Sequence, residues 1–489
     1  MTADGIDIER IVKEVLEELG RAREGREKPN PVVAPQTPKP SFIPPLHQSA
    51  PEKIDDMVEA SRQAFIAFRK LGIETRSKII SAIRAICESH AEELGKFAVE
   101  ETGLGKMPDK AQKALLAVRK TPGIEDLISR SFSGDHGLTL EELAPYGVIG
   151  SITPSTNPVS TIINNSISML SAGNSVIFCP HPAAKRVSYR TATLIQEAVL
   201  QAGGPPNLVQ AIKEPSQEIA RALMHHAGID LLVVTGGGVV VDLAMKSGKK
   251  AICAGPGNPP VVVDETAIIE KAGRDIVEGA SFDNNVLCIA EKEVFVVESV
   301  AERLKRVMRE CGAYEISGSA VERLTHMVIA EDKEGKGERH PIVNRAFVGK
   351  NASFILEKCG ITPPKDVRLI IFEAQWDHPL VMAEQLMPVL PVVRVRDVGE
   401  AIRYAIIAEH RFKHTFIMHS TNIVALSKMA QLCDANIFVK NGPSLAGLGF
   451  NGEGYTTLTI AGTTGEGLTT ARTFARPRRC TLVDYFRIV

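Results

Sequence analysis

Apolar residues recur at helical spacing over the first twenty positions of the chain, and charged residues occupy the opposite face. The apolar positions are Ile8, Ile11, Val12, Val15, Leu16 and Leu19. This pattern predicts a short amphipathic helix over residues 1–20. Residues 21–50 are first charged and then rich in proline, which predicts an extended linker. A tethered helix has to dock its apolar face on the globular body or on a partner, unless it is a frayed end without a role.

Helical patterns continue from about Pro51 to Arg130, and short apolar runs then alternate with further helical patterns. The first runs are residues 146–153, 175–179, 231–235 and 260–263. A second series consists of residues 293–297, 368–372, 389–395, 414–418 and 435–439. Such runs are typical of buried parallel strands, so their order predicts an α/β protein with two α/β domains.

Two stretches fit neither series, residues 138–144 before the first run and residues 480–486 at the end of the chain. We expect them to pair as a small protruding β-flap. An exposed edge of this kind commonly marks an oligomer interface, so the flap favours a homo-oligomer, a dimer or a tetramer.

Composition narrows the function classes. The 489 residues are 44% hydrophobic with a formal net charge of -1, which gives no field for nucleic acid. No apolar run approaches the ~20 residues of a membrane span, and the polar face of the first helix is too acidic for a membrane surface. The eight cysteines show no metal-ligand spacing and no secretory signal precedes them, so we expect no metal, free thiols and a reducing compartment.

Cys288 is the main candidate for chemistry. It lies between an Asn-rich turn and a β-branched run, in the segment Ser-Phe-Asp-Asn-Asn-Val-Leu-Cys that begins at residue 281. A thiolate is a strong nucleophile, and the turn offers amides that can stabilise charge beside it. Taken alone, a cysteine before a strand is more often a packed core residue.

Turns at the ends of the predicted strands are the candidates for ligand binding. One turn contains Thr153, Pro154, Ser155 and Asn157, and another is Thr235 followed by Gly236, Gly237 and Gly238. Three glycines after a strand allow the backbone to approach a phosphate or a ribose, although they do not form the dinucleotide fingerprint and a glycine-rich loop alone is weak evidence.

The order and spacing of these segments resemble the aldehyde dehydrogenase superfamily from about residue 50 onward. The resemblance implies that Cys288 is the nucleophile, that Asn157 stabilises the oxyanion, and that Glu384, in Glu-Gln-Leu-Met-Pro-Val, holds the nicotinamide ribose. It also implies the domain plan. Residues 51–255 would form a Rossmann-type cofactor domain, with residues 130–145 contributing to the flap. Residues 256–440 would form the catalytic domain, and residues 441–489 would return to the cofactor domain and the oligomerisation strand.

One departure from the hydrolytic members suggests the acyl acceptor. Those enzymes carry a glutamate that activates water, whereas residues 253–260 here read Cys-Ala-Gly-Pro-Gly-Asn-Pro-Pro. Without that base, the thioester on Cys288 should survive until a thiol attacks it. This pattern is similar to the CoA-acylating aldehyde dehydrogenases. Residues 179–184, 254–266, 410–415 and 447–455 resemble the propionaldehyde and acetaldehyde dehydrogenases of bacterial microcompartments.

The resemblance implies further partners. Residues 1–20 would be an encapsulation peptide that binds shell or lumen proteins, which places the enzyme in a microcompartment lumen within the bacterial cytoplasm. Cys179, His181 and Pro182 stand where many relatives have a Lys-Pro-x-Glu motif that binds the adenosine ribose. Without that glutamate NADP is not excluded, and NAD is expected because the subfamily that the chain resembles favours it. A hydrolytic aldehyde dehydrogenase and a non-catalytic scaffold remain the alternatives.

Overall fold

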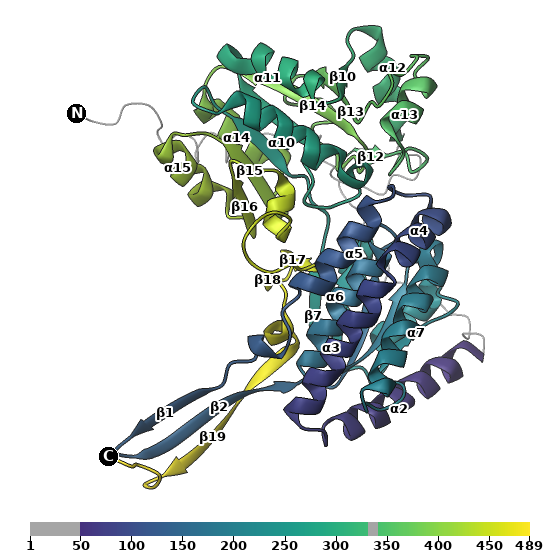
Figure 1. Cartoon of the computed structure of the whole chain (residues 1–489), viewed down its shortest axis with the longest axis vertical. Helices are drawn as coiled ribbons and strands as arrows, with labels where there is room; N and C mark the ends of the chain where they lie inside the picture. Colours follow the sequence, from purple (N-terminus) through teal and green to yellow (C-terminus); the bar gives the residue numbers. More distant parts are fainter. Residues whose placement is uncertain (1–48, 331–340) are drawn as a thin grey trace, which may run out of the picture.

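The computed structural model describes residues 49–330 and 341–489, with side chains from residue 54 onward. The helix predicted over residues 1–20 and the linker predicted over residues 21–50, except its last two positions, lie outside the described residues. Figure 1 shows two lobes stacked along the long axis, and a β-arm that projects from the lower lobe and carries the C-terminus.

The lower lobe contains a five-stranded sheet in the order β5-β4-β3-β6-β7, and all its neighbouring strands are parallel. The strands are β3 (Val148–Thr153), β4 (Ser175–Pro180), β5 (Val209–Ala211), β6 (Leu231–Thr235) and β7 (Ala251–Ala254). Both β3 and β4 are buried along their whole length, because helices cover the sheet. The helices are α2 (Ser49–Phe68), α3 (Ile73–Ser89), α4 (Ala91–Thr102), α5 (Asp109–Lys120), α6 (Pro158–Ser171), α7 (Lys185–Gln201), α8 (Gln217–His225) and α9 (Gly238–Met245).

The upper lobe contains a seven-stranded sheet in the order β10-β13-β14-β9-β8-β15-β16, again parallel throughout. Its strands are β8 (Pro260–Val263), β9 (Glu293–Val297), β10 (Ala313–Glu315), β13 (Leu369–Glu373), β14 (Val389–Val395), β15 (Thr415–His419) and β16 (Ile437–Lys440). Its helices are α10 (Ile269–Ser281), α11 (Glu298–Glu310), α12 (Ser319–Val328), α13 (Ala352–Lys358), α14 (Val398–Ala408) and α15 (Ile423–Cys433). On α11, Ala301, Leu304 and Met308 are buried at helical spacing.

The predicted α/β class with parallel sheets is confirmed by both lobes. Grouping the run at 260–263 with the first series of strands is wrong, since β8 lies between β9 and β15 in the upper sheet. The run falls within residues 256–440, the range that the resemblance assigns to the catalytic domain. The chain therefore crosses between the lobes in the short segment from Ala254 to Pro260. Strands β5, β7 and β10 were not predicted, because runs of three or four residues at or near a sheet edge carry little periodicity.

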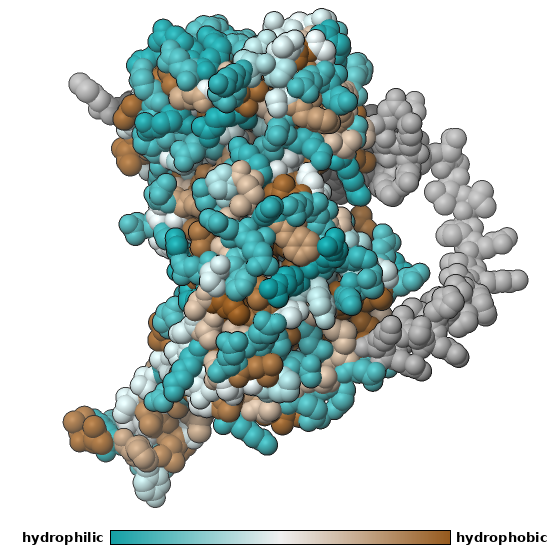
Figure 2. All heavy atoms as spheres, turned by 45° about the vertical axis from the view of Figure 1, so that its right-hand side comes forward, coloured by the Kyte–Doolittle hydropathy of each residue, from teal (hydrophilic) through white to brown (hydrophobic). Residues whose placement is uncertain are grey.

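The arm is a three-stranded antiparallel sheet of β1 (Arg130–Gly134), β2 (Gly137–Pro145) and β19 (Ala475–Val483). The predicted pairing of the two unassigned stretches is confirmed, with Leu140 opposite Cys480. Strand β19 starts five residues before the predicted stretch, because its polar first half hides the strand pattern. Apolar side chains are exposed along the arm and at its tip, as Figure 2 shows. They are Phe132, Leu140, Leu482, Val483, Tyr485, Phe486, Ile488 and Val489.

The remaining elements are short. Strands β11 (Ile329–Ala330) and β12 (Ile342–Val343) pair with each other, as do β17 (Ile460–Ala461) and β18 (Gly467–Leu468). The 3₁₀ turns are η1 (Ile124–Asp126), η2 (Pro182–Ala184), η3 (Phe282–Asn285), η4 (Ser444–Leu448) and η5 (Ala471–Phe474). Within the described residues, no helix is both long enough and apolar enough to cross a membrane.

Candidate active site

The loop that carries Cys288 begins with an unusual turn. After α10 ends at Ser281, Asp283, Asn284 and Asn285 follow one another with φ of 46°, 54° and 66°. Asp and Asn tolerate this left-handed region better than most residues, which explains the Asn-rich sequence. Asn285 fixes the loop, because its Nδ2 donates to the carbonyls of Ala280 and Glu291, both at 2.9 Å. The turn thus delivers Cys288 to the boundary between the lobes, just before β9.

The segment that lacks the water-activating glutamate lies directly against Cys288. A Cβ atom placed on Gly257 would be 2.7 Å from the Cys288 carbonyl oxygen and 2.9 Å from Cγ of His414. These contacts place Gly257, His414 and the Cys288 backbone in one packed group. Burial is the main cause that lowers the pKa of His414 to about 4, so its imidazole is neutral near neutral pH.

Buried charges surround the thiol. Nζ of Lys292 donates to Asn285 Oδ1 at 2.6 Å and to the Leu287 carbonyl at 2.9 Å. Burial raises the pKa of Glu384 to about 7, although Lys292 and the backbone N–H of Gly257 act in the opposite direction. Burial and then Glu384 raise the pKa of Cys288 to about 12, while Lys292 and Lys113 oppose them. The free protein therefore holds Cys288 as a thiol, with two buried lysines whose charged forms favour its ionisation.

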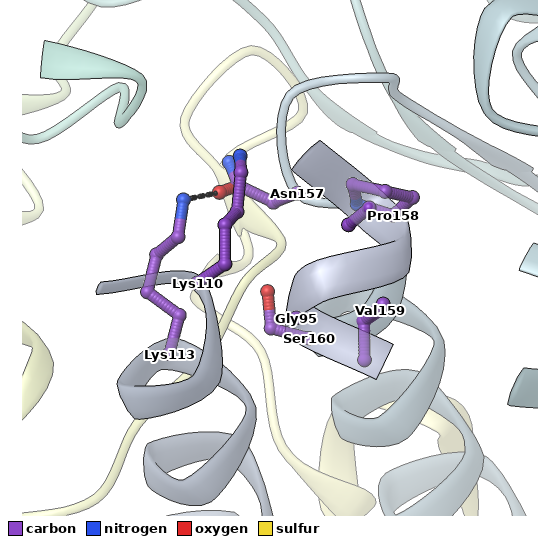
Figure 3. Close-up of a pocket in the computed structure, with 8 residues that line it drawn as sticks. Gly95, Lys110, Lys113, Asn157, Pro158, Val159 and Ser160 are labelled. Carbon is purple, nitrogen blue, oxygen red and sulfur yellow. Dashed lines mark hydrogen bonds between the residues drawn. The ribbon is translucent and has the colours of Figure 1, made fainter. Parts of the chain in front are cut away.

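Asn157 stands at the start of α6, next to the nucleophile loop. It precedes Pro158, the first residue of the helix, and its side chain is buried. Its Oδ1 accepts a hydrogen bond from Nζ of Lys113 at 2.5 Å, drawn as the dashed line in Figure 3. Lys113 also forms an ion pair with Asp283 and donates to the carbonyl of Val286 at 3.2 Å. One lysine of α5 thus joins the predicted oxyanion residue to the loop of the predicted nucleophile.

The predicted cofactor residues gather at the carboxyl ends of adjacent strands in the lower sheet. Thr153, at the end of β3, lies opposite Pro180 of β4, and its carbonyl accepts from His181 N at 3.0 Å. Pro154 and Ser155 follow directly. Strand β6 pairs with the other side of β3 and ends at Thr235. The predicted turns therefore lie together at the carboxyl end of the sheet, where α/β proteins bind nucleotides.

The glycines after β6 leave their backbone accessible. A Cβ atom on Gly236, Gly237 or Gly238 would meet nothing within 4 Å, so the backbone is open to a ligand. Gly237 caps the N-terminus of α9, whose free N–H groups suit a phosphate. In the neighbouring turn, His181 and Pro182 lead into η2, and Ala183 N donates to Nδ1 of His181 at 3.1 Å. Cys179 is different, because it is buried in β4 and burial raises its pKa to about 12, which is the behaviour of a core residue.

Comparison with known proteins shows the family. Residues 22–444 match the Aldehyde dehydrogenase family. The chain belongs to the aldehyde dehydrogenase family. It is 50% identical over 438 residues to an acetaldehyde dehydrogenase (acetylating), EutE, of Salmonella typhimurium, covering 89% of this chain and 92% of that protein.

Solved aldehyde dehydrogenase structures are similar over almost the same length. A propionaldehyde dehydrogenase from a fucose utilisation microcompartment of Clostridium phytofermentans is 45% identical with a TM-score of 0.86, covering 89% of this chain and 98% of that one. The propionaldehyde dehydrogenase of Rhodopseudomonas palustris, with bound CoA and an acylated cysteine, is 48% identical with a TM-score of 0.85, covering 88% and 97%. An engineered glycolyl-CoA reductase with bound NADP+ is 47% identical with a TM-score of 0.86, covering 89% and 98%.

Several residues of this aldehyde dehydrogenase site were not predicted from sequence, namely Lys113, Asp283, Lys292 and His414. Lysines are usually exposed, so the polar positions of α5 were not considered as site residues. A signal was nevertheless present, because Lys110 and Lys113 lie on the same stripe as the small apolar Ala114 and Ala117 at i, i+3, i+4 and i+7. A lysine in the apolar stripe of a helix has to meet a buried partner.

Proposed function

We propose that this aldehyde dehydrogenase oxidises a short aliphatic aldehyde, propionaldehyde or acetaldehyde, and transfers the acyl group from Cys288 to CoA. The observation that carries the proposal is the contact of Gly257 with the Cys288 backbone, in a segment that contains no carboxylate. A thioester next to this segment has no general base within it to deprotonate water, which favours survival of the thioester until CoA arrives. The solved relative with bound CoA and an acylated cysteine supports the same route.

The residues of the chain divide the reaction between them. The Cys288 thiolate attacks the aldehyde carbonyl, and its formation is favoured by Lys292 and Lys113. The Nδ2 group of Asn157 and the Cys288 backbone N–H would donate to the oxyanion of the tetrahedral adduct. Bound NAD or NADP supplies a nicotinamide that accepts the hydride. Loss of hydride leaves an acyl thioester on Cys288, and attack by the CoA thiolate releases acyl-CoA and restores the Cys288 thiolate.

The open glycines 236–238, with Thr153, Pro154, Ser155, His181 and Pro182, would hold the dinucleotide along the edge of the lower sheet. Glu384 is assigned to the nicotinamide ribose because its segment, Glu-Gln-Leu-Met-Pro-Val, resembles that of the family, and its charge also acts on the Cys288 thiol. A residue in this place can orient the nicotinamide toward the nucleophile. Both NAD and NADP are compatible with the segment at 179–182, because the acidic residue that disfavours a 2′-phosphate is missing.

Omission of CoA tests the acceptor. Without CoA, the protein should reduce about one NAD per active site and then almost stop, as a stalled acyl-enzyme requires. Cys288→Ala should abolish aldehyde-dependent NADH formation and keep the melting temperature. Sustained production of free carboxylic acid by the wild type would instead establish the hydrolytic reaction.

We further propose that the protein works inside a microcompartment, with residues 1–20 as the encapsulation peptide and the arm as the oligomer contact. A structural relative from a microcompartment and the exposed apolar residues of the arm support this. Deleting residues 1–20 should leave activity in solution unchanged and release a reporter fusion from purified compartments. If the fusion stays on the shells after the deletion, residues 1–20 are not the encapsulation peptide. If light scattering shows a monomer, the arm is not an oligomer contact.

A further inference from the structure

We propose that Lys113 is the positioning residue of the oxyanion site, where it fixes the carboxamide of Asn157 with Nδ2 toward the aldehyde oxygen. This inference rests on the roles of Cys288 and Asn157 in the proposed function. It assigns a task to a buried lysine of α5 that the reaction steps above use only as a nearby charge.

The Nζ group of Lys113 is buried among acceptors, and Asp283 acts to keep it an ammonium although burial lowers its pKa to about 7. Its side chain is only 3% exposed, and an ammonium group has three N–H donors. Three acceptors face it, namely Asn157 Oδ1 at 2.5 Å, the Val286 carbonyl at 3.2 Å and the Asp283 carboxylate. The first belongs to the start of α6 and the other two to the loop of Cys288. Lys113 therefore sets the position of the oxyanion donor relative to the nucleophile.

The contact also decides which way the Asn157 amide points. An ammonium group donates only, so the amide oxygen has to face Lys113, and a flipped amide would set NH₂ against NH₃⁺. The nitrogen then faces the other side. Among the described residues its recorded contact is a long one, 3.4 Å to Thr156 Oγ1, which leaves an N–H available for substrate. Without Lys113, the amide torsion has two broad minima of similar energy, and one of them presents oxygen to the oxyanion.

The surrounding charges strengthen the donor. Lys110 lies 3.0 Å from the same carboxylate of Asp283 and donates to the Thr156 carbonyl at 2.6 Å. Lys106 and Asp109 form a further pair at 3.7 Å. The cluster holds three lysines and two aspartates, and Asp283 acts to keep Lys113 charged although burial lowers its pKa to about 7. A fixed positive charge in a buried site stabilises an oxyanion and polarises the Asn157 amide.

Lys110 provides a matched comparison. It is on the same helix as Lys113, equally buried, and paired with the same Asp283, but the contact it makes near the site is to the backbone of Thr156 and not to the amide of Asn157. Figure 3 shows the two lysines side by side, with the dashed line running from Lys113 alone. A purely structural role predicts similar consequences when either lysine is removed, whereas positioning of Asn157 is specific to Lys113.

A double-mutant cycle of Lys113→Met and Asn157→Ala tests the inference, with Lys110→Met and Asn157→Ala as the parallel cycle. The readout is the rate of the NADH burst without CoA, divided by the folded fraction of each variant. The melting temperature of each variant is measured as a check on its stability. We expect Asn157→Ala to lower the rate about 10²–10³-fold, as for other oxyanion donors. Lys113→Met should lower it ~10–100-fold with little change in the aldehyde KM. In the Asn157→Ala background it should add less than about threefold, the part that comes from losing the Lys113 charge near the Cys288 thiol. Lys110→Met should cost less and multiply with Asn157→Ala.

Rate losses of Lys113→Met and Asn157→Ala that multiply would overturn the inference, as would equal losses for the two lysine variants. If Lys113→Met does not fold, Lys113→Gln replaces it in the cycle, and multiplying losses there have the same meaning. The NADH burst is measured without CoA. Its rate therefore reports aldehyde oxidation, whether the acyl group is later transferred to CoA or to water. A wild type that turns over without CoA would therefore refute the proposed function and leave the outcome of the cycle intact.

Discussion

The two sides of the site are built in opposite ways. Around Cys288 the backbone is strained and the side chains are buried and charged, with three consecutive residues at positive φ and with Lys113, Lys292 and Glu384 acting on the thiol. After β6 the backbone is open, because the glycines 236–238 have empty space where side chains would be. Packed side chains fill one side, whereas the proposed dinucleotide side exposes bare backbone.

This difference reflects two physical tasks. Charge that develops in a transition state is stabilised best by donors already held in place, which requires buried partners and a determined backbone. A dinucleotide brings its own charge and hydrogen-bonding groups, so its site mainly needs access to backbone N–H groups at a helix N-terminus. On the filled side glycine is needed because no Cβ atom fits, and on the open side because a side chain would occupy the ligand's space. Replacing one glycine on each side distinguishes these two reasons.

Gly105→Ala should have the largest effect, because it breaks the filled side. Gly105 has φ of 75°, and a Cβ atom there would lie 2.0 Å from Oδ1 of Asp283. The carboxylate that holds Lys113 must then move, and overpacking together with a left-handed alanine costs roughly 2–4 kcal/mol. We expect a lower melting temperature and at least a tenfold slower NADH burst. Gly72→Ala is the control, since its Cβ would meet nothing within 4 Å; equal behaviour of the two variants would contradict the prediction.

Gly237→Val should affect binding alone. Gly237 has φ of -68° and ψ of 164°, which valine adopts without strain, and its Cβ would meet no atom within 4 Å. The melting temperature should stay within about one degree, while the added side chain occupies the space of the ligand. We expect the KM for NAD to rise tenfold or more, with unchanged alkylation of Cys288. Calorimetry of NAD binding checks it, and wild-type affinity would show that the dinucleotide lies elsewhere.

The two sides also differ in how far the sequence predicts them. The open side follows from local signals, because strand runs that end in glycine and proline turns identify the edge of a parallel sheet. The filled side depends on pairs far apart in the chain. Lys113 meets Asp283 across 170 residues, and nothing near either residue specifies the other. Family resemblance supplied Cys288, Asn157 and Glu384, since these are single positions in recognisable segments, but it did not supply the charges that surround them.

Burial is the other quantity that the sequence concealed. Nothing in the amino-acid sequence distinguishes Lys113 and Lys292 from surface lysines. The folded structure shows that both are almost fully buried. The pKa of Lys113 falls to about 7 through burial, while Asp283 acts to keep it charged. Strand β8 gave a similar difficulty, because an apolar run does not reveal which of two sheets it joins. Local patterns predict elements, whereas packing between distant elements decides charge and topology.

Glu384→Gln should produce the smallest effect and tests whether the charges on the filled side act on Cys288 as inferred. The Glu384 carboxyl has a pKa of about 7, and its ionised form is one cause of the raised pKa of the Cys288 thiol. Below pH 7 the wild-type carboxyl is mostly neutral, so the variant and the wild type should react alike with iodoacetamide. As the pH rises through about 7, the wild-type group becomes an anion that opposes thiolate formation, and the variant lacks it.

We therefore expect Cys288 of Glu384→Gln to be alkylated a few-fold faster than wild-type Cys288 at pH 8–9, with the ratio returning to one near pH 5.5. Mass spectrometry of the peptide containing Cys288 distinguishes it from the other seven cysteines. Alkylation of buried Cys179 measures any general loosening of the fold, and it should stay slow in both proteins. A ratio that is the same at every pH would mean that Glu384 does not titrate beside the thiol. The charge of Glu384 would then have no effect on the ionisation of Cys288.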